Sequence, residues 1–376
     1  MNLSDESGRM IIPTDRVRDL TSAPRHIPIE IEGNVTFEVG MTIWSVLNPK
    51  SNTALDLGQD WHDKVTELTS EELGTELADL GGPYAFAWLG LASLMLSAPH
   101  PHDPTRVYDW LGGIDEERLR RWIVGYASDN ADSSLIEEVV GGDAEAITRL
   151  LGDKPEKAAM NEFITWLVRT EGLPSRYASA LQRFRAEVFA EFEPEFGAAI
   201  SRAAAARRAA PTRGDAKTVV EEVTVGLDFE IPIGVTRVVL IPSMVTRPLS
   251  LINGHRETLI VYYGVADEFV DADPEAPPSW LVRIYKALSD DKRLRIMRRL
   301  SEGSASLDEL SEMLGLTKST VHHHINQLRG AGLIRVHVPA DKTKSRHSYS
   351  MREQSLADAA GFLDSYLGTS PERQHA

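Results

Sequence analysis

The sequence contains no cysteine. This absence excludes disulfides, thiolate nucleophiles, iron–sulfur clusters and thiolate-ligated zinc. A long apolar run is also missing, because the uncharged stretch between Asp79 and Asp103 leaves about 16 residues of helix, fewer than the roughly 20 that a membrane span needs. We interpret residues 83–98 as a buried core helix, with a membrane anchor as the alternative. The N-terminus shows no signal peptide, which predicts a cytoplasmic protein.

Motifs of catalysis are scarce as well. The chain has no glycine-rich phosphate loop, no H-E-x-x-H and no G-x-S-x-G. The dense ligand-like cluster of His100, His102 and Asp103 lies between prolines, and Asp103 is suited to cap a helix. We therefore favour a structural loop over a metal site there. The sequence predicts no enzymatic activity, no cofactor and no metal site.

Charge divides the chain into two parts. The net charge is −16, yet residues 279–351 hold thirteen Lys or Arg against seven Asp or Glu, a net of +6 that leaves −22 for the rest. The length of 376 residues favours two or three domains. A basic segment on an acidic body indicates a nucleic-acid-binding module. The acidic, proline-containing residues 267–279 have the composition of a linker. We therefore predict a domain over 1–266, a linker, a second domain over 280–368 and a tail over 369–376.

The second domain shows the pattern of a helix-turn-helix. Ser306 and Glu309 form a capping box before one helix, which Gly315 ends. Thr317 then caps the helix KSTVHHHINQLRGAG, whose Val321, Ile325 and Leu328 lie one turn apart. Two amphipathic helices precede this pair. The second helix of the pair is placed to be the recognition helix.

A hairpin and a last helix follow. LIRVHVPADKTKSRHSYSM alternates like two strands, and the loop between them carries cations suited to phosphate contact, as a wing does. Residues 353–368 then show the spacing of an amphipathic helix.

Residues 280–368 resemble the winged helix-turn-helix of ArsR-type bacterial transcriptional regulators. The motifs KALSDDKRLRIMRRL and LDELSEMLGLTKSTVHHHINQLRGAGLIRV and the basic wing carry this resemblance. It implies double-stranded DNA as a partner and a homodimer whose seam joins the first and fifth helices of the module, through Trp280, Leu281, Ile284, Tyr285, Phe362, Leu363 and Tyr366. Metal sensing is not carried over, since thiolate sets are impossible here and the last helix has no paired histidines.

Side chains that point away from the apolar face of the recognition helix are the candidates for DNA contact. With the start of that helix and the wing, the predicted set is Thr317, Lys318, Ser319, Thr320, His322, His323, Asn326, Lys342, Lys344 and Arg346. The three consecutive histidines point about 100° apart and cannot converge on one metal ion. We interpret His324, beside the apolar face, as a packing residue.

The N-terminal region predicts a larger, mostly helical α+β domain, so the fold class is mainly α with small β elements. The sequence IPIEIEGNVTFEVG indicates either a hairpin at Gly33-Asn34 or a lone strand Val35–Val39 leading into a helix. Two strands, VTRVVLIPS and ETLIVYYG, are separated by Asn253-Gly254. Helical patterns cover 60–79, 84–98, 104–112, 115–128, 143–152, 156–170 and 173–208. A large uncharacterised domain with a late IPS-x-x-x-RP-x-x-L strand pair resembles that of some ArsR-like regulators.

Together these features predict a sequence-specific transcriptional regulator, with repression as the favoured output. It would bind a pseudo-palindromic operator as a homodimer. Its N-terminal domain would respond to a small-molecule or protein effector, and no membrane is involved. The alternative is a metabolite-binding or enzymatic N-terminal domain whose winged helix makes protein contacts.

Overall fold

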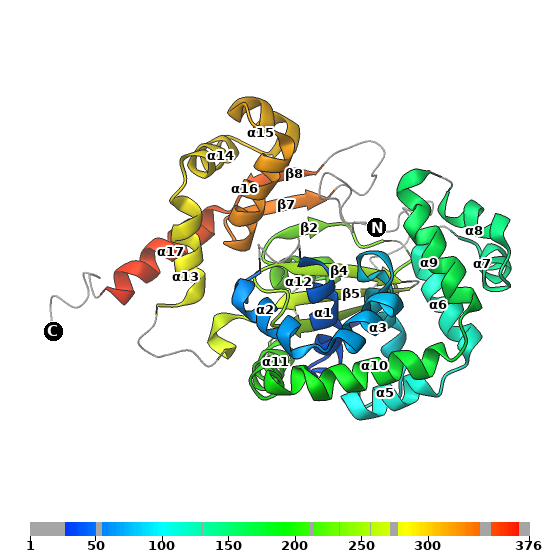
Figure 1. Ribbon diagram of the computed structural model, residues 1–376. Helices are drawn as coiled ribbons and strands as arrows, with labels where there is room; N and C mark the ends of the chain where they lie inside the picture. The colour runs from blue at the N-terminus through cyan, green and yellow to red at the C-terminus, as the bar shows by residue number, and fades with distance from the viewer. Residues whose placement is uncertain are drawn as a thin grey trace.

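The computed structural model (Figure 1) describes residues 27–49, 55–128, 131–152, 154–210, 214–232, 234–255, 257–270, 277–338 and 347–367. The chain is mostly helical and carries two small four-stranded sheets, so the predicted fold class is confirmed. The proposed division at 267–279 remains a prediction, and residues 271–276 of it lie outside the described residues.

Twelve α-helices fill the N-terminal part of the described chain. They are α1 Thr36–Leu47, α2 Gly58–Leu68, α3 Glu71–Gly81, α4 Phe86–Met95, α5 Pro104–Gly112, α6 Glu116–Ala127, α7 Ser133–Val140, α8 Ala144–Leu151, α9 Ala158–Arg169, α10 Leu173–Glu187, α11 Glu193–Ala209 and α12 Ala216–Val223. The helical patterns at 60–79 and 173–208 each cover two helices. The side chain of Ser70 caps α3 and so starts a new helix, and Pro194 stands in the first turn of α11. The sequence did not predict α7 or α12.

The first sheet has the strand order β1-β3-β5-β4. It consists of β1 Ile29–Ile31, β3 Arg237–Ser243, β4 Ser250–His255 and β5 Thr258–Gly264. Strands β1, β3 and β5 run parallel, and β4 lies antiparallel to β5. Both interpretations of residues 27–40 are wrong, because β1 pairs with the distant β3 and α1 begins at Thr36. The side chain of Asn34 accepts a hydrogen bond from the Thr36 amide at 3.0 Å, at the start of the helix. Asn253 also lies inside a strand rather than in a turn, and its side chain donates to the Leu89 carbonyl.

The apolar segment at 83–98 lies in the core. All ten residues of α4 are buried, which agrees with its interpretation as a core helix. None of the helices among the described residues has the length and apolar character to cross a membrane.

The first sheet separates two hydrophobic cores. On β3, Val239 and Ile241 belong to a core shared with the N-terminal helices, whereas Val238 and Leu240 belong to a second core. This alternation is that of a strand buried on both faces. The second core also contains the apolar face of the C-terminal helices, among them Ile325. The C-terminal part and one face of the sheet therefore share a continuous core.

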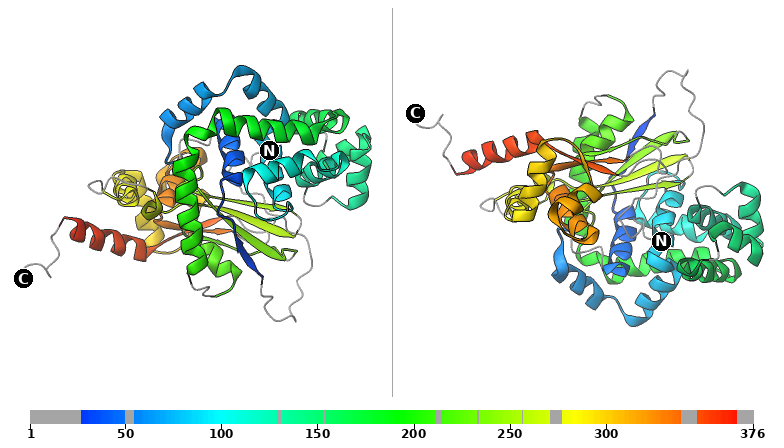
Figure 2. Two further views of the ribbon diagram at one scale, coloured as in Figure 1. Left: turned by 90° about the horizontal axis from the view of Figure 1, so that it is seen from below. Right: turned by 90° about the horizontal axis from the view of Figure 1, so that it is seen from above.

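The C-terminal part contains five helices and three strands, grouped on one side of the molecule and coloured yellow to red in Figure 2. Its elements are α13 Ser279–Leu288, α14 Asp291–Ser301, β6 Ala305–Ser306, α15 Leu307–Leu314, α16 Lys318–Gly330, β7 Ile334–Val338, β8 Ser348–Met351 and α17 Glu353–Tyr366. The predicted order of helices and hairpin is confirmed.

A strand from the N-terminal part completes the second sheet, whose order is β2-β7-β8-β6. Strand β2, Leu227–Phe229, pairs in parallel with β7 through Leu227 and Val336, Asp228 and His337, and Phe229 and Val338. The side chains of Asp228 and His337 also meet, with Oδ2 and Nδ1 2.9 Å apart. The sheet of the winged helix is thus extended by residues that precede their partner strand β7 by more than a hundred positions.

Candidate nucleic-acid interface

The turn between α15 and α16 is built by local hydrogen bonds. The Ser306 hydroxyl accepts from the Glu309 amide at 3.3 Å, and the Glu309 carboxylate accepts from the Ser306 amide at 2.7 Å, which confirms the capping box. The hydrogen bonds that the Ser306 amide and hydroxyl donate to the Glu309 carboxylate hold the pKa of Glu309 below its usual value. At the other end of α15, Gly315 adopts the left-handed conformation with φ of 66°, so a glycine suits this turn.

Three buried side chains fix the roll of α16. Val321, Ile325 and Leu328 are at most 1% exposed and face the second core. The hydroxyl of Thr317 accepts a hydrogen bond from the Thr320 amide and caps the helix. The opposite side of the first turn consequently points away from the protein.

The structure places most of the predicted helix residues on this outer side. Thr317, Lys318, Ser319, Thr320 and His323 are exposed. The free amides of a helix N-terminus, together with hydroxyls and an imidazole, can meet phosphates and base edges.

Several of the predicted residues already contact other side chains of the chain. The Lys318 ammonium lies 2.7 Å from a carboxylate oxygen of Asp308 on α15, although its side chain is 59% exposed. One turn further, the Asn326 amide nitrogen lies 3.2 Å from Nδ1 of His322. Both residues are half-buried. Any DNA contact by Lys318 would compete with its pairing to Asp308.

The flanking histidine His324 is half-buried, as its interpretation as a packing residue requires. Its Nδ1 lies 3.9 Å from Asp290, the residue whose side chain caps α14. Burial lowers the pKa of His324, and the hydrogen bond from the Arg293 amide lowers the pKa of Asp290. His324 therefore belongs to the contact between α16 and α14.

The wing is described only at its base. Strands β7 and β8 pair antiparallel, with Val336 opposite Tyr349 and Ile334 opposite Met351. The predicted wing contacts Lys342, Lys344 and Arg346 lie outside the described residues.

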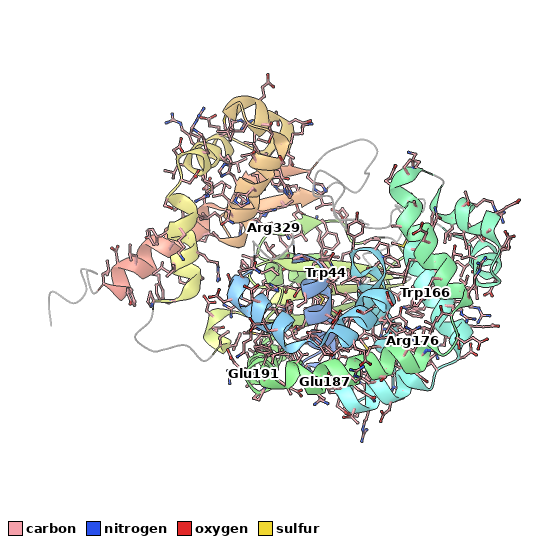
Figure 3. The ribbon with its side chains drawn as sticks, in the orientation of Figure 1. Trp44, Trp166, Arg176, Glu187, Glu191 and Arg329 are labelled. Carbon is pink, nitrogen blue, oxygen red and sulfur yellow. The ribbon has the colours of Figure 1, made fainter. Side chains whose placement is uncertain are left out.

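The far end of α16 rests on the N-terminal part. A Cβ atom on Gly330 would lie 3.1 Å from the Pro248 ring, so only a small residue allows this approach. Figure 3 shows Arg329, in the last turn of α16, at the side of the winged helix that faces the N-terminal part. In Figure 1, α14 and α15 lie on the opposite side, away from it.

A four-residue ion-pair cluster, which we call the junction, connects the N-terminal part to α13. It consists of Asp56, Arg247, Asp267 and Arg283. Arg247 pairs with Asp267, and Arg283 donates to Asp56 at 2.5 Å. The second carboxylate oxygen of Asp267 accepts from the Trp280 amide at 2.6 Å in the first turn of α13. Arg247 and Asp267 side chains are only 8% and 13% exposed, so their charges are weakly screened.

The sequence did not predict the junction or strand β2. Arg247 stands in the IPS-x-x-x-RP motif, and this motif gave the one available signal. Its partners are separated from it by up to about 190 residues, a distance over which pairing leaves no trace in a single sequence.

The predicted dimer residues fall into two groups. Leu281 and Ile284 are at most 4% exposed because they pack in the second core of their own chain. Tyr285, Phe362 and Tyr366 are 38–46% exposed, while Trp280 and Leu363 are intermediate. The Trp280 and Phe362 rings pack edge to face at 4.9 Å. Helix α17 projects beyond the rest of the molecule (Figure 1) and carries part of this exposed apolar surface.

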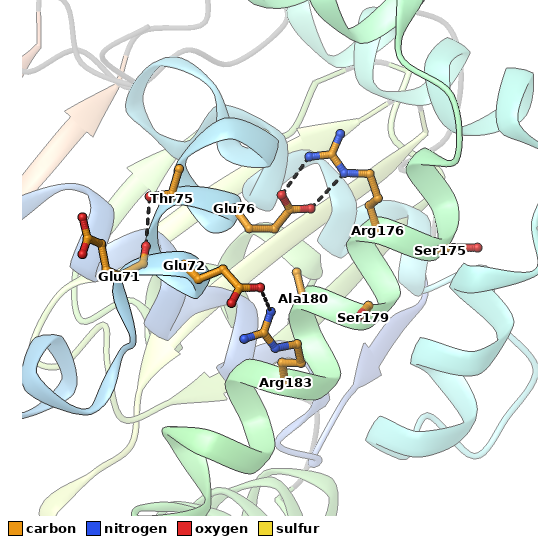
Figure 4. Close-up of a pocket in the computed structure, with 9 residues that line it drawn as sticks. All are labelled: Glu71, Glu72, Thr75, Glu76, Ser175, Arg176, Ser179, Ala180 and Arg183. Carbon is orange, nitrogen blue, oxygen red and sulfur yellow. Dashed lines mark hydrogen bonds and ion pairs between the residues drawn. The ribbon is translucent and has the colours of Figure 1, made fainter.

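A surface groove of about 800 Å³ lies between α3 and α10 (Figure 4). Two ion pairs cross it: Arg176 binds Glu76 through two hydrogen bonds of 2.9 and 2.8 Å, and Arg183 lies 3.2 Å from Glu72. The hydrogen bonds to Glu76 raise the pKa of Arg176, and the hydrogen bond to Glu187 raises the pKa of Arg183. Since both of its arginines are already paired with carboxylates, the groove gives no observation in favour of a metabolite-binding or enzymatic domain.

Comparisons with known proteins single out the same segment. The profile described as "Bacterial regulatory protein, arsR family" matches residues 290–336, from α14 into β7. The HTH-type transcriptional regulator CmtR of Mycobacterium bovis is 37% identical over 89 residues, which are 24% of this chain and 72% of that protein. The uncharacterized HTH-type transcriptional regulator YceK of Bacillus subtilis is 38% identical over 86 residues, 22% of this chain and 81% of the relative. A crystal structure of an ArsR family transcriptional regulator aligns at 24% identity and a TM-score of 0.21, covering 24% of this chain and 94% of its own. The large N-terminal region has no family assignment.

Proposed function

Because this chain belongs to the arsR family of bacterial regulatory proteins, we propose that it represses transcription by binding a pseudo-palindromic operator as a homodimer. Its helix-turn-helix makes it a DNA-binding transcriptional regulator. Such a protein works in the cytoplasm, where the chromosome of a bacterium lies.

The observation that carries the proposal is the first turn of α16. This turn exposes hydroxyls and an ammonium on one side and the next turn adds the imidazole of His323, while Val321, Ile325 and Leu328 hold the other side in the core. Ser319 and His323, four positions apart, lie on the same face of the helix. Both can hydrogen-bond base edges in a major groove.

Replacing Ser319 and His323 together with alanine tests this assignment. We expect affinity for the operator to fall at least about 30-fold, because two contacts to base edges at roughly 1–3 kcal/mol each sum to at least about 2 kcal/mol. Affinity for unrelated DNA depends on phosphate contacts and should change little. Fluorescence anisotropy with operator and scrambled duplexes measures both quantities.

The control is Gln182→Ala on α10, which removes an exposed polar side chain that bonds Asp109 on the surface of the N-terminal part. This variant should bind both duplexes like the wild type. An equal loss on operator and scrambled DNA in the Ser319/His323 variant would contradict base readout by α16.

The dimer would form through the exposed apolar residues of α13 and α17. Two-fold symmetry would then place the half-sites about one helical turn apart.

We expect Phe362→Glu to weaken dimerisation more than about tenfold, since it puts a charge at an apolar interface on both subunits. Sedimentation velocity over a concentration series measures the shift. Leu68→Glu, an equally exposed leucine on α2 at 36%, is the matched control and should leave the sedimentation coefficient unchanged. A monomeric wild type at all concentrations would contradict the dimer.

The N-terminal part would modulate operator affinity in response to a small-molecule or protein effector. Two contacts support this coupling: the junction holds the first turn of α13, and β2 pairs with β7 at the base of the wing. An effector that shifts either contact would change the position of the DNA-binding helices.

A further inference from the structure

Two histidines and a glutamate from distant parts of the N-terminal chain meet at one edge of the first sheet. Glu32 directly follows β1, and its amide donates to the Leu240 carbonyl of β3 at 3.0 Å. His100 and His102 belong to the loop that joins α4 to α5. One ligand atom from each of the three side chains lies within 4.8 Å of the others. Glu32 and His102 are 70 positions apart, so no local sequence motif contains all three residues.

Hydrogen bonding determines which nitrogen of His102 faces Glu32. Nε2 lies 2.9 Å from the Ala98 carbonyl oxygen, which can only accept, so Nε2 carries a hydrogen. Nδ1 lies 2.9 Å from a carboxylate oxygen of Glu32. With the hydrogen on Nε2, the lone pair of Nδ1 faces a carboxylate oxygen of Glu32. Two such acceptors this close need either a proton or a metal cation between them. A histidine that donates its other N–H to a backbone carbonyl is the usual arrangement of a metal ligand.

The loop that carries His102 is held in place by α1. The Thr36 hydroxyl donates to the His102 carbonyl at 2.5 Å, and the Tyr108 hydroxyl donates to the Thr36 carbonyl at 2.9 Å. His102 is 4% exposed and Glu32 8%. His102 and Glu32 are therefore held in place and largely shielded from water. This arrangement favours direct coordination of a cation by their side chains over contact through water molecules.

His100 supplies the third donor and the route of entry. Its ring stacks on that of His102, with centroids 3.9 Å apart, and it is exposed to solvent. Rotation of this exposed side chain would bring its nitrogen to the roughly 2.0–2.1 Å that a zinc–histidine bond requires. A fourth position would stay open to water.

Asp103, by contrast, is not part of the cluster. Its side chain accepts from the Arg106 amide at 3.1 Å to cap α5 and lies 3.3 Å from the Arg106 guanidinium. The helix cap predicted from the sequence is therefore present. The carboxylate that joins the two histidines is that of Glu32, not that of Asp103.

We propose that Glu32, His100 and His102 bind one divalent transition-metal cation of the zinc class. Two imidazoles and one carboxylate are a donor set that suits Zn²⁺, Co²⁺ or Ni²⁺ rather than Mg²⁺ or Ca²⁺. The site lies in the N-terminal part, outside the residues that the arsR profile matches.

The test is an equilibrium titration of the full-length, chelator-treated protein with Zn²⁺ against a chromophoric competitor. The wild type should bind one equivalent tightly. His100→Ala and Glu32→Gln should each weaken that site more than about tenfold. Asp103→Asn is the matched control, because asparagine also caps a helix and the charge of Asp103 is not used by the site. It should bind Zn²⁺ like the wild type.

Circular dichroism and thermal melts, recorded for every variant with and without Zn²⁺, separate loss of the site from loss of the fold. Bound Zn²⁺ should raise the melting temperature of the wild type and of Asp103→Asn only. His100 is exposed, so this variant keeps the test decisive even if Glu32→Gln does not fold. Equal Zn²⁺ affinity in wild type and His100→Ala, or no tight equivalent at all, would overturn the proposal.

Discussion

Replacing Asp267 with alanine is expected to destabilise the protein by about 3 kcal/mol, the low end of the cost of removing one partner from a buried ion pair. The substitution leaves Arg247, which is 8% exposed, with only Asp56 at 3.5 Å, and it deprives the Trp280 amide of its acceptor. The midpoint of urea unfolding, followed by tryptophan fluorescence, measures the loss.

Glu268→Ala provides the matched control, because Glu268 is the exposed acid next along the same turn. Removing it takes away the same charge without touching the junction, so stability should change by less than about 0.5 kcal/mol. Equal midpoints for the two variants would show that the junction contributes nothing to stability. Operator affinity, measured on both variants, should change only for Asp267→Ala if the junction transmits the state of the N-terminal part to α13.

A second large effect concerns the buried carboxyl of Glu38 on α1. One of its oxygens accepts from the Met244 and Val245 amides at 2.7 and 2.8 Å, at the turn that leads from β3 to Arg247. Complete burial raises the pKa of Glu38 from 4.5 to about 7, against the effect of these hydrogen bonds. The folded protein consequently holds a proton that the unfolded chain releases between these two values.

Stability should therefore fall as pH rises from about 4.5 to 7, since the folded state binds more protons than the unfolded state in this window. The expected loss is about 3 kcal/mol for a difference of this size. Glu38→Gln keeps the accepting oxygen and cannot ionise, so its profile should lack this decline. Urea unfolding at a series of pH values between 5 and 8.5 compares the two proteins. Parallel profiles would contradict ionisation of a buried Glu38, because other titrating groups contribute equally to both.

Local signals predicted the winged helix almost completely. The Ser306 and Glu309 capping box, Gly315 in the left-handed conformation and the Val321, Ile325 and Leu328 stripe each arise within a few residues of chain. Their geometry follows from backbone hydrogen bonding and a 3.6-residue period, which a single sequence displays directly.

The N-terminal part was less predictable because its strands pair across long distances. Strand β1 finds its partner β3 about two hundred positions later, and β2 has only three residues, too short to show a period. For the same reason the sequence did not show that Asp267 and strand β2 contact the winged helix. Nor did it show that Glu32 contacts the histidine loop. A cap such as Asp103 is visible in sequence, whereas a side chain brought in by a parallel strand is not.

Selection of genomic fragments by the purified full-length chain tests DNA recognition most directly. We expect a small set of sequences to be enriched, each with two related half-sites about one helical turn apart. Affinity for the enriched site should fall steeply between about 50 and 200 mM salt, and Lys342→Ala/Lys344→Ala should flatten that dependence. If no fragment is enriched at any salt concentration in this range, the helix-turn-helix does not read DNA sequence and the proposed function is wrong.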